Sequence, residues 1–277
     1  MAEIKAYAKI NLFLDIIGKL DNGYHSLFMV MQSVGLADDV IIEKSDKIKL
    51  KCSEKSIPCN EKNTAFKAAK EFFAYTGINA GADIEIIKKI PHEAGLAGGS
   101  ADAAAVIKGL NEIYGTNLTR QEMCEIGLKV GSDVPFCIVG GTCLSQNTGG
   151  VISPLKKLKD CTIVLVKPDR GVSTPQAYAD ADSTYIYHPD CIRMLDVCEK
   201  GDFEGICKYA ANVFEQVVEV PERVEIKWIM RENNASLTQM SGSGPTVFGL
   251  FEKEEDALNA EKELKKQFDK VFVTKPV

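Results

Sequence analysis

The sequence predicts an α+β fold in two domains. The chain has 277 residues, of which 45% are hydrophobic, and that is enough for two modest cores. In the first half, extended segments precede and alternate with amphipathic helices, a pattern that predicts a sheet with helices packed on it. The second half mixes short buried strands with helices. We expect the domains to be residues 1–155 and 156–277, with a boundary near 150–160.

Periodicity and end signals place the elements of the first half. Strands are expected at residues 3–18, 26–36, 40–43, 48–52 and 82–90. The Asp21-Asn22-Gly23 turn separates the first two strands. Helices are expected at 64–75, 100–114 and 119–130, with N-caps at Asn63 or Thr64, Ser100 and Thr119, and stops at Gly77 and Gly115.

The second half begins with an apolar run that predicts a hairpin. Its strands would be residues 134–139 and 142–145, joined at Gly140-Gly141. The remaining strands are expected at 162–166, 246–251 and 271–273. Helices are expected at 189–199, 202–218, 221–233 and 254–268.

Composition limits the class of protein. A net charge of -6 argues against a general nucleic-acid binder, because such a protein needs a basic surface. No apolar stretch approaches the roughly 18 residues of a membrane span, and the N-terminus lacks the pattern of a signal peptide. The nine cysteines show no CxxC spacing, so we expect reduced thiols and no metal site built from them. These observations predict a cytoplasmic protein. We expect a monomer or a homodimer, although the sequence itself does not determine the oligomeric state.

The most informative segment is the glycine-rich loop that runs from Pro91 into the alanine-rich stretch after Ser100. Glycines at 95, 98 and 99 allow backbone N–H groups to converge at the start of a helix. Such a helix start favours an anion, and a polyphosphate is the natural guest. The alternative is a tight loop before a core helix, without a ligand. A P-loop is excluded because the chain contains no GxxxxGK[ST], and the loop is not a Rossmann GxGxxG.

Three further features are compatible with phosphoryl transfer, although each has a simpler explanation. Lys9 lies on the same strand face as Asn11, which is either a solvated outer face or the wall of a cleft. Asp133, in the Gly131–Phe136 run, is either a turn former or a base that takes a proton from an alcohol. The Ser241–Thr246 loop is either a flexible turn or a second set of backbone donors.

The order and spacing of three runs resemble the GHMP kinase superfamily. They are Lys9-Ile10-Asn11-Leu12, the loop from Pro91 to Ser100, and Ser241-Gly242-Ser243-Gly244-Pro245. The narrower match rests on the runs at residues 6–12, 21–27 and 131–136, and the similarity extends from residue 3 to about 273. The resemblance implies a two-domain fold of mixed sheets and helices, with the active site in the cleft between the domains.

The resemblance also implies an activity. It is ATP-dependent phosphorylation of the 2-hydroxyl of a cytidine diphosphate-linked methylerythritol, a small-molecule substrate of non-mevalonate isoprenoid biosynthesis. Asp133 matches the catalytic base, and Lys9 matches the lysine that keeps it ionised. Mg²⁺ is expected with the ATP. The positions that match the ATP-phosphate loop are Pro91, Gly95, Leu96, Ala97, Gly98, Gly99, Ser100 and Ala101.

The substrate side of the match involves four residues. Tyr24 and His25 match a pair that recognises cytidine, Tyr178 falls where the family places a second ring over the base, and Asn11 is expected at the polar end of the substrate. Ala97 and Ala101 depart from the glycine and serine that many members have, so metal ligands stay unassigned. The alternatives are another small-molecule kinase of the superfamily, such as a homoserine or mevalonate kinase, and a non-catalytic nucleotide-binding module.

Overall fold

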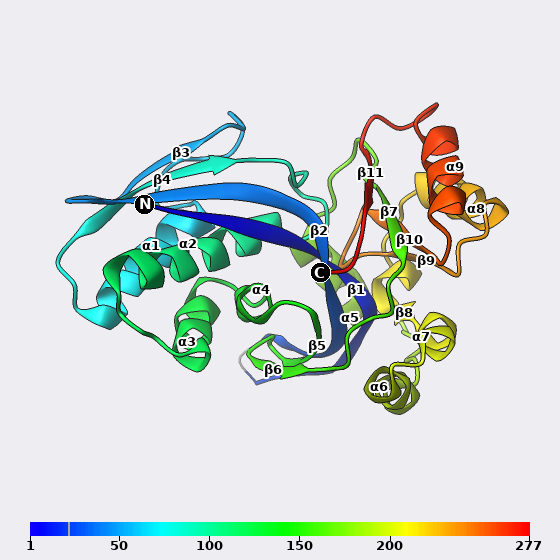
Figure 1. Cartoon of the computed structure of the whole chain (residues 1–277). Helices are drawn as coiled ribbons and strands as arrows, with labels where there is room; N and C mark the ends of the chain where they lie inside the picture. The colour runs from blue at the N-terminus through cyan, green and yellow to red at the C-terminus, as the bar shows by residue number, and fades with distance from the viewer. Residues whose placement is uncertain (22) are drawn as a thin grey trace. The chain divides into compact units, whose positions relative to one another are not determined.

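The computed structural model describes residues 1–21 and 23–277 (Figure 1), so Asn22 of the expected turn lies outside the described residues. Two compact units are formed from interleaved pieces of the chain. The first unit contains residues 1–8, 36–90 and 97–140, and the second contains residues 9–35, 91–96 and 141–277. Two long strands, β1 (Ala2–Lys19) and β2 (His25–Ser45), contribute to both units. The single boundary near residue 155 stays a prediction.

In the first unit, β1 and β2 are extended into a sheet by β4 (Gly81–Ile87) and β3 (Lys49–Cys52). The strand order is β3-β4-β2-β1, with β4 antiparallel to β2 and parallel to β3. The strands expected at 26–36 and 40–43 are one continuous strand. Asp38 and Asp39, in the gap between the two expected strands, make ion pairs with lysines, and the strand continues through them.

Four helices complete the first unit, and α1 (Thr64–Thr76) and α2 (Gly98–Tyr114) lie on one face of its sheet (Figure 1). The helix α2 contacts α1, α3 (Arg120–Val130) and α4 (Val134–Val139). The expected caps at Asn63 and Thr119 are confirmed, because both side chains accept backbone N–H groups of the first turn.

The prediction of a hairpin strand at 134–139 is wrong, since this segment is the helix α4. Residues 134, 135, 136 and 138 are buried, and a short, largely buried apolar run has no period that separates helix from strand. Thr142–Asn147 is the strand β5, and it pairs with β2 and with β6 (Val151–Pro154).

In the second unit, β8 (Ala211–Asn212) lies beside β1, and β5 lies beside β2. A separate antiparallel sheet has the order β11 (Val271–Thr274), β7 (Thr162–Val166), β10 (Val247–Phe251) and β9 (Leu237–Met240). It packs against α8 (Glu222–Glu232) and α9 (Glu254–Leu264) around a core that includes Val166, Met230 and Phe251.

The remaining elements of this unit are α5 (Thr174–Ser183), α6 (Cys191–Lys200), α7 (Phe203–Tyr209) and a 3-10 helix (Val213–Gln216). The helix expected over 202–218 is therefore broken at β8. The reason is Asn212, whose side chain accepts the N–H of Phe214 and donates to the carbonyls of Met240 and Gly242. In the described part of the chain, no helix is both long and apolar enough to cross a membrane.

Candidate active site

Lys9 is buried on β1 in the second unit, with only 4% of its surface exposed. Its ammonium donates to Asn11 Oδ1 at 2.7 Å and to the carbonyl of Gly95 at 3.2 Å. Asn11 is fully buried, so the interpretation of this strand face as a solvated outer surface is wrong. A buried ammonium is costly unless its hydrogen bonds are satisfied, and these two oxygens supply part of that requirement.

Two loops of the second unit meet beside Lys9. Ser241 donates from its hydroxyl to the carbonyl of Gly95 at 2.9 Å, and the backbone N–H of Lys9 donates to the carbonyl of Leu96 at 3.1 Å. At Gly95 φ is +73°, and a Cβ there would lie 2.2 Å from the carbonyl oxygen of Ser241, so only glycine fits. A Cβ at Gly242 would lie 3.3 Å from Lys9 Nζ. The structure thus brings together Lys9, residues 91–96 and the 241–245 loop.

The start of α2 belongs to the first unit and has the properties of an anion-binding helix end. The helix begins at Gly98, two residues earlier than predicted, and its N-cap Ala97 forms no side-chain hydrogen bond to the first turn. Ala97 has φ +56°, so this position needs a left-handed backbone even though the residue is alanine. The first amides of α2 therefore have no side-chain cap, and Gly98 and Gly99 add no side chains over them.

Asp102 lies near the start of α2, but its side chain does not cap the helix. Its carboxylate is buried and accepts a hydrogen bond from Lys88 Nζ at 2.7 Å, while the same ammonium pairs with buried Asp38. Asp38 in turn accepts the backbone N–H groups of Lys89 and Ile90. Burial raises the pKa of Asp102 to about 7, and the opposing ammonium of Lys88 does not cancel this effect.

Asp133 is half-buried at the N-cap of α4, in the first unit. The turn before it is close to the start of α2, since a Cβ at Gly131 would lie 3.9 Å from Ser100 Oγ. The backbone of Asp133 accepts the N–H of Cys137 at 3.1 Å, which fixes the residue at the first turn of α4. The first unit therefore gathers Asp133, Ser100 and the uncapped amides of α2. The role of Asp133 as a base stays a prediction.

The aromatic residues matched to cytidine recognition lie in the second unit. The rings of His25 and Tyr178 are stacked, with centroids 4.6 Å apart and planes inclined by 17°. Asp182 lies 2.6 Å from His25 Nε2 and also pairs with Lys19, and these hydrogen bonds lower the pKa of Asp182. Tyr24 is 67% exposed. Sequence reasoning did not include Asp182, because an aspartate within an exposed helix gives no distinguishing pattern.

Two buried amides that support the site were also missed. Asn212 Nδ2 donates to the carbonyls of Met240 and Gly242, at 2.7 and 2.8 Å. Gln239 Nε2 donates to the carbonyls of Asn11 and Leu12, at 2.9 and 3.2 Å. They hold the 241–245 loop and the strand that carries Lys9. Their partners are distant in sequence, so no local signal could have identified them.

Within residues 1–21 and 23–277, no group of three or more histidine, cysteine, aspartate or glutamate side chains could hold a metal ion. A magnesium ion that arrives with a nucleotide needs few protein ligands, because phosphate oxygens and water fill most of its coordination shell. The half-buried hydroxyl of Ser100, at the start of α2, is compatible with such a ligand. Asp102 is already paired with Lys88 through Oδ2.

Comparison with known proteins defines the class. Residues 63–141 match the family model "GHMP kinases N terminal domain", and residues 194–270 match "GHMP kinases C terminal". The chain belongs to the GHMP kinase family. The resemblance inferred from the sequence motifs is confirmed, and so is the two-domain α+β fold.

Full-length relatives narrow this class. The 4-diphosphocytidyl-2-C-methyl-D-erythritol kinase of Clostridium acetobutylicum is 44% identical over 278 residues, covering 99% of each chain. A crystal structure of 4-(cytidine 5'-diphospho)-2C-methyl-D-erythritol kinase matches with a TM-score of 0.81 at 27% identity, over 99% of both chains. Homoserine kinase from Cytophaga hutchinsonii matches with a TM-score of 0.78 over 98% of this chain and 93% of its own. At 19% identity, that match shows the fold alone.

Proposed function

We propose that this chain is an ATP-dependent kinase that phosphorylates the 2-hydroxyl of 4-diphosphocytidyl-2-C-methyl-D-erythritol. The observation that carries the proposal is the 44% identity over the full chain to a relative of that name. The buried lysine beside two glycine loops supports it, because phosphoryl transfer needs cations and backbone donors around the moving phosphate. The expected oligomeric state and cytoplasmic location stay predictions.

The phosphoryl donor would bind at the start of α2. The amides of Gly98, Gly99 and Ser100 lie in the first turn, which has no side-chain cap, and the helix dipole favours negative charge there. The segment from Pro91 to Ala101 would surround the phosphates of ATP. Ser100 would contact a phosphate or a Mg²⁺ ion, which neutralises charge on the transferring group.

The acceptor chemistry would use Lys9 and Asp133. A tertiary hydroxyl is a crowded and weakly acidic nucleophile, so its proton must be accepted as the oxygen attacks phosphorus. Asp133 would accept that proton. Lys9, which is oriented by Asn11 and the carbonyl of Gly95, would stabilise negative charge on the oxygen and on the carboxylate. Asn11 would also contact the polar end of the substrate.

The cytosine end of the substrate would be recognised by Tyr24, His25 and Tyr178. The His25–Tyr178 stack supplies an aromatic surface on which a base can lie. An ionised Asp182 only accepts hydrogen bonds, so His25 Nε2 carries the proton that it donates to Asp182. In the neutral ring, Nδ1 is then an acceptor for the amino group of cytosine. An exposed ring such as Tyr24 can close over the base.

The test is a coupled assay of ADP formation by the purified full chain with Mg-ATP. We expect ADP release upon addition of the cytidylyl alcohol, and none above background with homoserine or mevalonate. Release with homoserine or mevalonate alone would assign a different kinase. Tight ATP binding without ADP release from any alcohol would indicate a non-catalytic nucleotide-binding module.

A further inference from the structure

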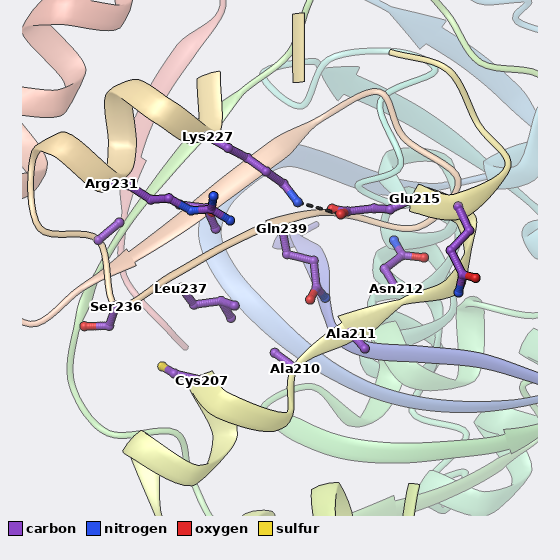
Figure 2. Close-up of a pocket in the computed structure, with 13 residues that line it drawn as sticks. Cys207, Ala210, Ala211, Asn212, Glu215, Lys227, Arg231, Ser236, Leu237 and Gln239 are labelled. Atoms are coloured by element: carbon purple, nitrogen blue, oxygen red, sulfur yellow. Dashed lines mark hydrogen bonds and ion pairs between the residues drawn. The ribbon is translucent and has the colours of Figure 1, made fainter. Parts of the chain in front are cut away.

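A cavity lies in the second unit, and its wall includes Asn212 and Gln239, the two amides that hold the 241–245 loop and the strand that carries Lys9. It has a volume of about 560 Å³ and is bounded by β8, the 3-10 helix, α8 and β9 (Figure 2). Both β8 and β9 are the last strands of their sheets. The polar side chains at its wall include Asn212, Glu215, Lys227, Arg231, Thr238 and Gln239.

The helix α8 presents a row of cations on this side. Arg223, Lys227 and Arg231 are spaced four residues apart, so they follow one face of the helix, and the last two line the cavity. At 100° per residue, the acidic residues of α8 fall on the opposite face. These are Glu222, Glu225 and Glu232. Figure 2 shows Lys227 and Arg231 extending from α8 on the same side.

These three cations are matched by a single carboxylate, that of Glu215. It accepts Lys227 Nζ at 2.5 Å and the N–H of Met240 at 2.6 Å, so its charge is already compensated. Arg223 donates to the carbonyls of Val218 and Glu215, and Arg231 donates through Nε to Thr238 Oγ1 at 3.1 Å. Within the described residues, neither arginine has an acidic partner.

The pKa of the Lys227 ammonium is lowered, mainly because the group is buried. Glu215 opposes this shift, and the nearby guanidinium groups of Arg223 and Arg231 add a smaller lowering. Arginine cannot lose its proton in a protein, so the excess positive charge must be compensated by water or by an anion. A guanidinium whose terminal nitrogens are not engaged also offers a planar fork that suits phosphate oxygens.

We propose that this cavity binds a small anion that carries a phosphate or diphosphate group, with Arg231 as its main ligand and Lys227 as a second cation. The hydroxyls of Ser236 and Thr238 lie on the same wall and can complete the polar contacts. The walls are also tied to the 241–245 loop through Asn212, which donates to Gly242, and Glu215 accepts the N–H of Met240, the residue just before that loop. The anion site does not depend on the proposed function. Only an effect of the bound anion on catalysis, transmitted through that loop, would rest on it.

The probe is inorganic pyrophosphate, titrated calorimetrically into the full chain at constant ionic strength in metal-free buffer. Saturating ADP is present, so that the phosphate-binding loop at α2 is occupied. We expect one pyrophosphate per chain that ADP does not displace. Arg231→Gln should weaken this binding by about tenfold or more, because it removes a charge-assisted contact, and Arg231→Lys should retain part of the affinity.

Arg120→Gln is the matched control, since it removes the same charge from an exposed position on α3. It should bind pyrophosphate as the parent chain does, and circular dichroism should show that all variants are folded. Native-like affinity in Arg231→Gln would overturn the proposal, as would an equal loss in Arg120→Gln or complete displacement by ADP. Because no turnover is measured, failure here leaves the kinase proposal untouched, and absence of kinase activity leaves this result untouched.

Discussion

Two charge clusters of this protein are unbalanced in opposite directions. In the first unit, Lys88 is shared by Asp38 and Asp102, so one negative charge is in excess. In the second unit, Glu215 faces Arg223, Lys227 and Arg231, so positive charge is in excess. The first cluster can lose its excess negative charge, because one of its carboxyl groups can take up a proton near neutral pH. Arginine cannot release one, so the second cluster remains available for an anion.

The largest expected effect comes from removing the central cation of the acidic cluster. Lys88→Met leaves two buried carboxylates without their ammonium, and we expect the free energy of unfolding to fall by about 3–5 kcal/mol. Urea denaturation at pH 8 measures this loss. The loss should be smaller at pH 5, because protonation then neutralises a carboxyl group.

Lys227→Met is the matched substitution in the other cluster. The Glu215 carboxylate would keep the N–H of Met240, and Arg223 would still donate to the backbone carbonyl of Glu215, so we expect a loss of only about 1 kcal/mol. Lys49→Met, at an exposed ion pair with Asp83, should cost less than about 0.5 kcal/mol. If Lys88→Met cost no more than these two variants, the acidic cluster would not be a buried unit.

The second prediction concerns pH. The pKa of Asp102 is raised to about 7, whereas an unfolded aspartate titrates near 4, so the folded state holds the proton more tightly between these values. The contribution of this group to stability is therefore complete below about pH 4, decreases as the pH rises, and is lost above about pH 7. Between pH 5 and 8, this group should lower the free energy of unfolding of the parent chain by about 2–3 kcal/mol. Asp102→Asn should remove that decrease.

Unfolding midpoints of the parent chain and of Asp102→Asn across this pH range measure that difference. Asp160→Asn, at an exposed ion pair with Lys157, should follow the parent curve. An Asp102→Asn curve that also follows the parent would show that the cluster does not rely on a proton at Asp102.

Local signals in the sequence explain which elements could be predicted. Helix ends at Asn63, Thr119 and Gly115 were predictable because a cap is a chemical requirement of the adjacent backbone. The secondary structure predicted for residues 134–139 and 202–218 was wrong because tertiary contacts determine the conformation of these segments. The first is a short buried run without a period, and the second is interrupted by hydrogen bonds from Asn212 to a distant loop.

In the candidate site, too, local motifs were predictable and features set by tertiary contacts were not. The glycine loop and Lys9 could be recognised from motifs, but burial of Lys9 and Asn11 could not, since alternation marks a shared face and not its surroundings. The clusters around Asp102 and Arg231 combine residues from separate elements. The four-residue spacing of cations on α8 is visible in the sequence. Only the structure shows that, among residues 1–21 and 23–277, Arg223 and Arg231 have no acidic partner.

The most direct test of the proposed function removes the negative charge of Asp133. In steady-state assays with Mg-ATP and the cytidylyl alcohol, Asp133→Asn should lose about a thousandfold or more in kcat with little change in KM, because the carboxylate acts mainly in the transition state. Asp169→Asn, at an exposed ion pair with Lys270, should retain normal turnover. Near-normal kcat in a folded Asp133→Asn protein would contradict the proposal that this carboxylate takes the proton of the acceptor hydroxyl.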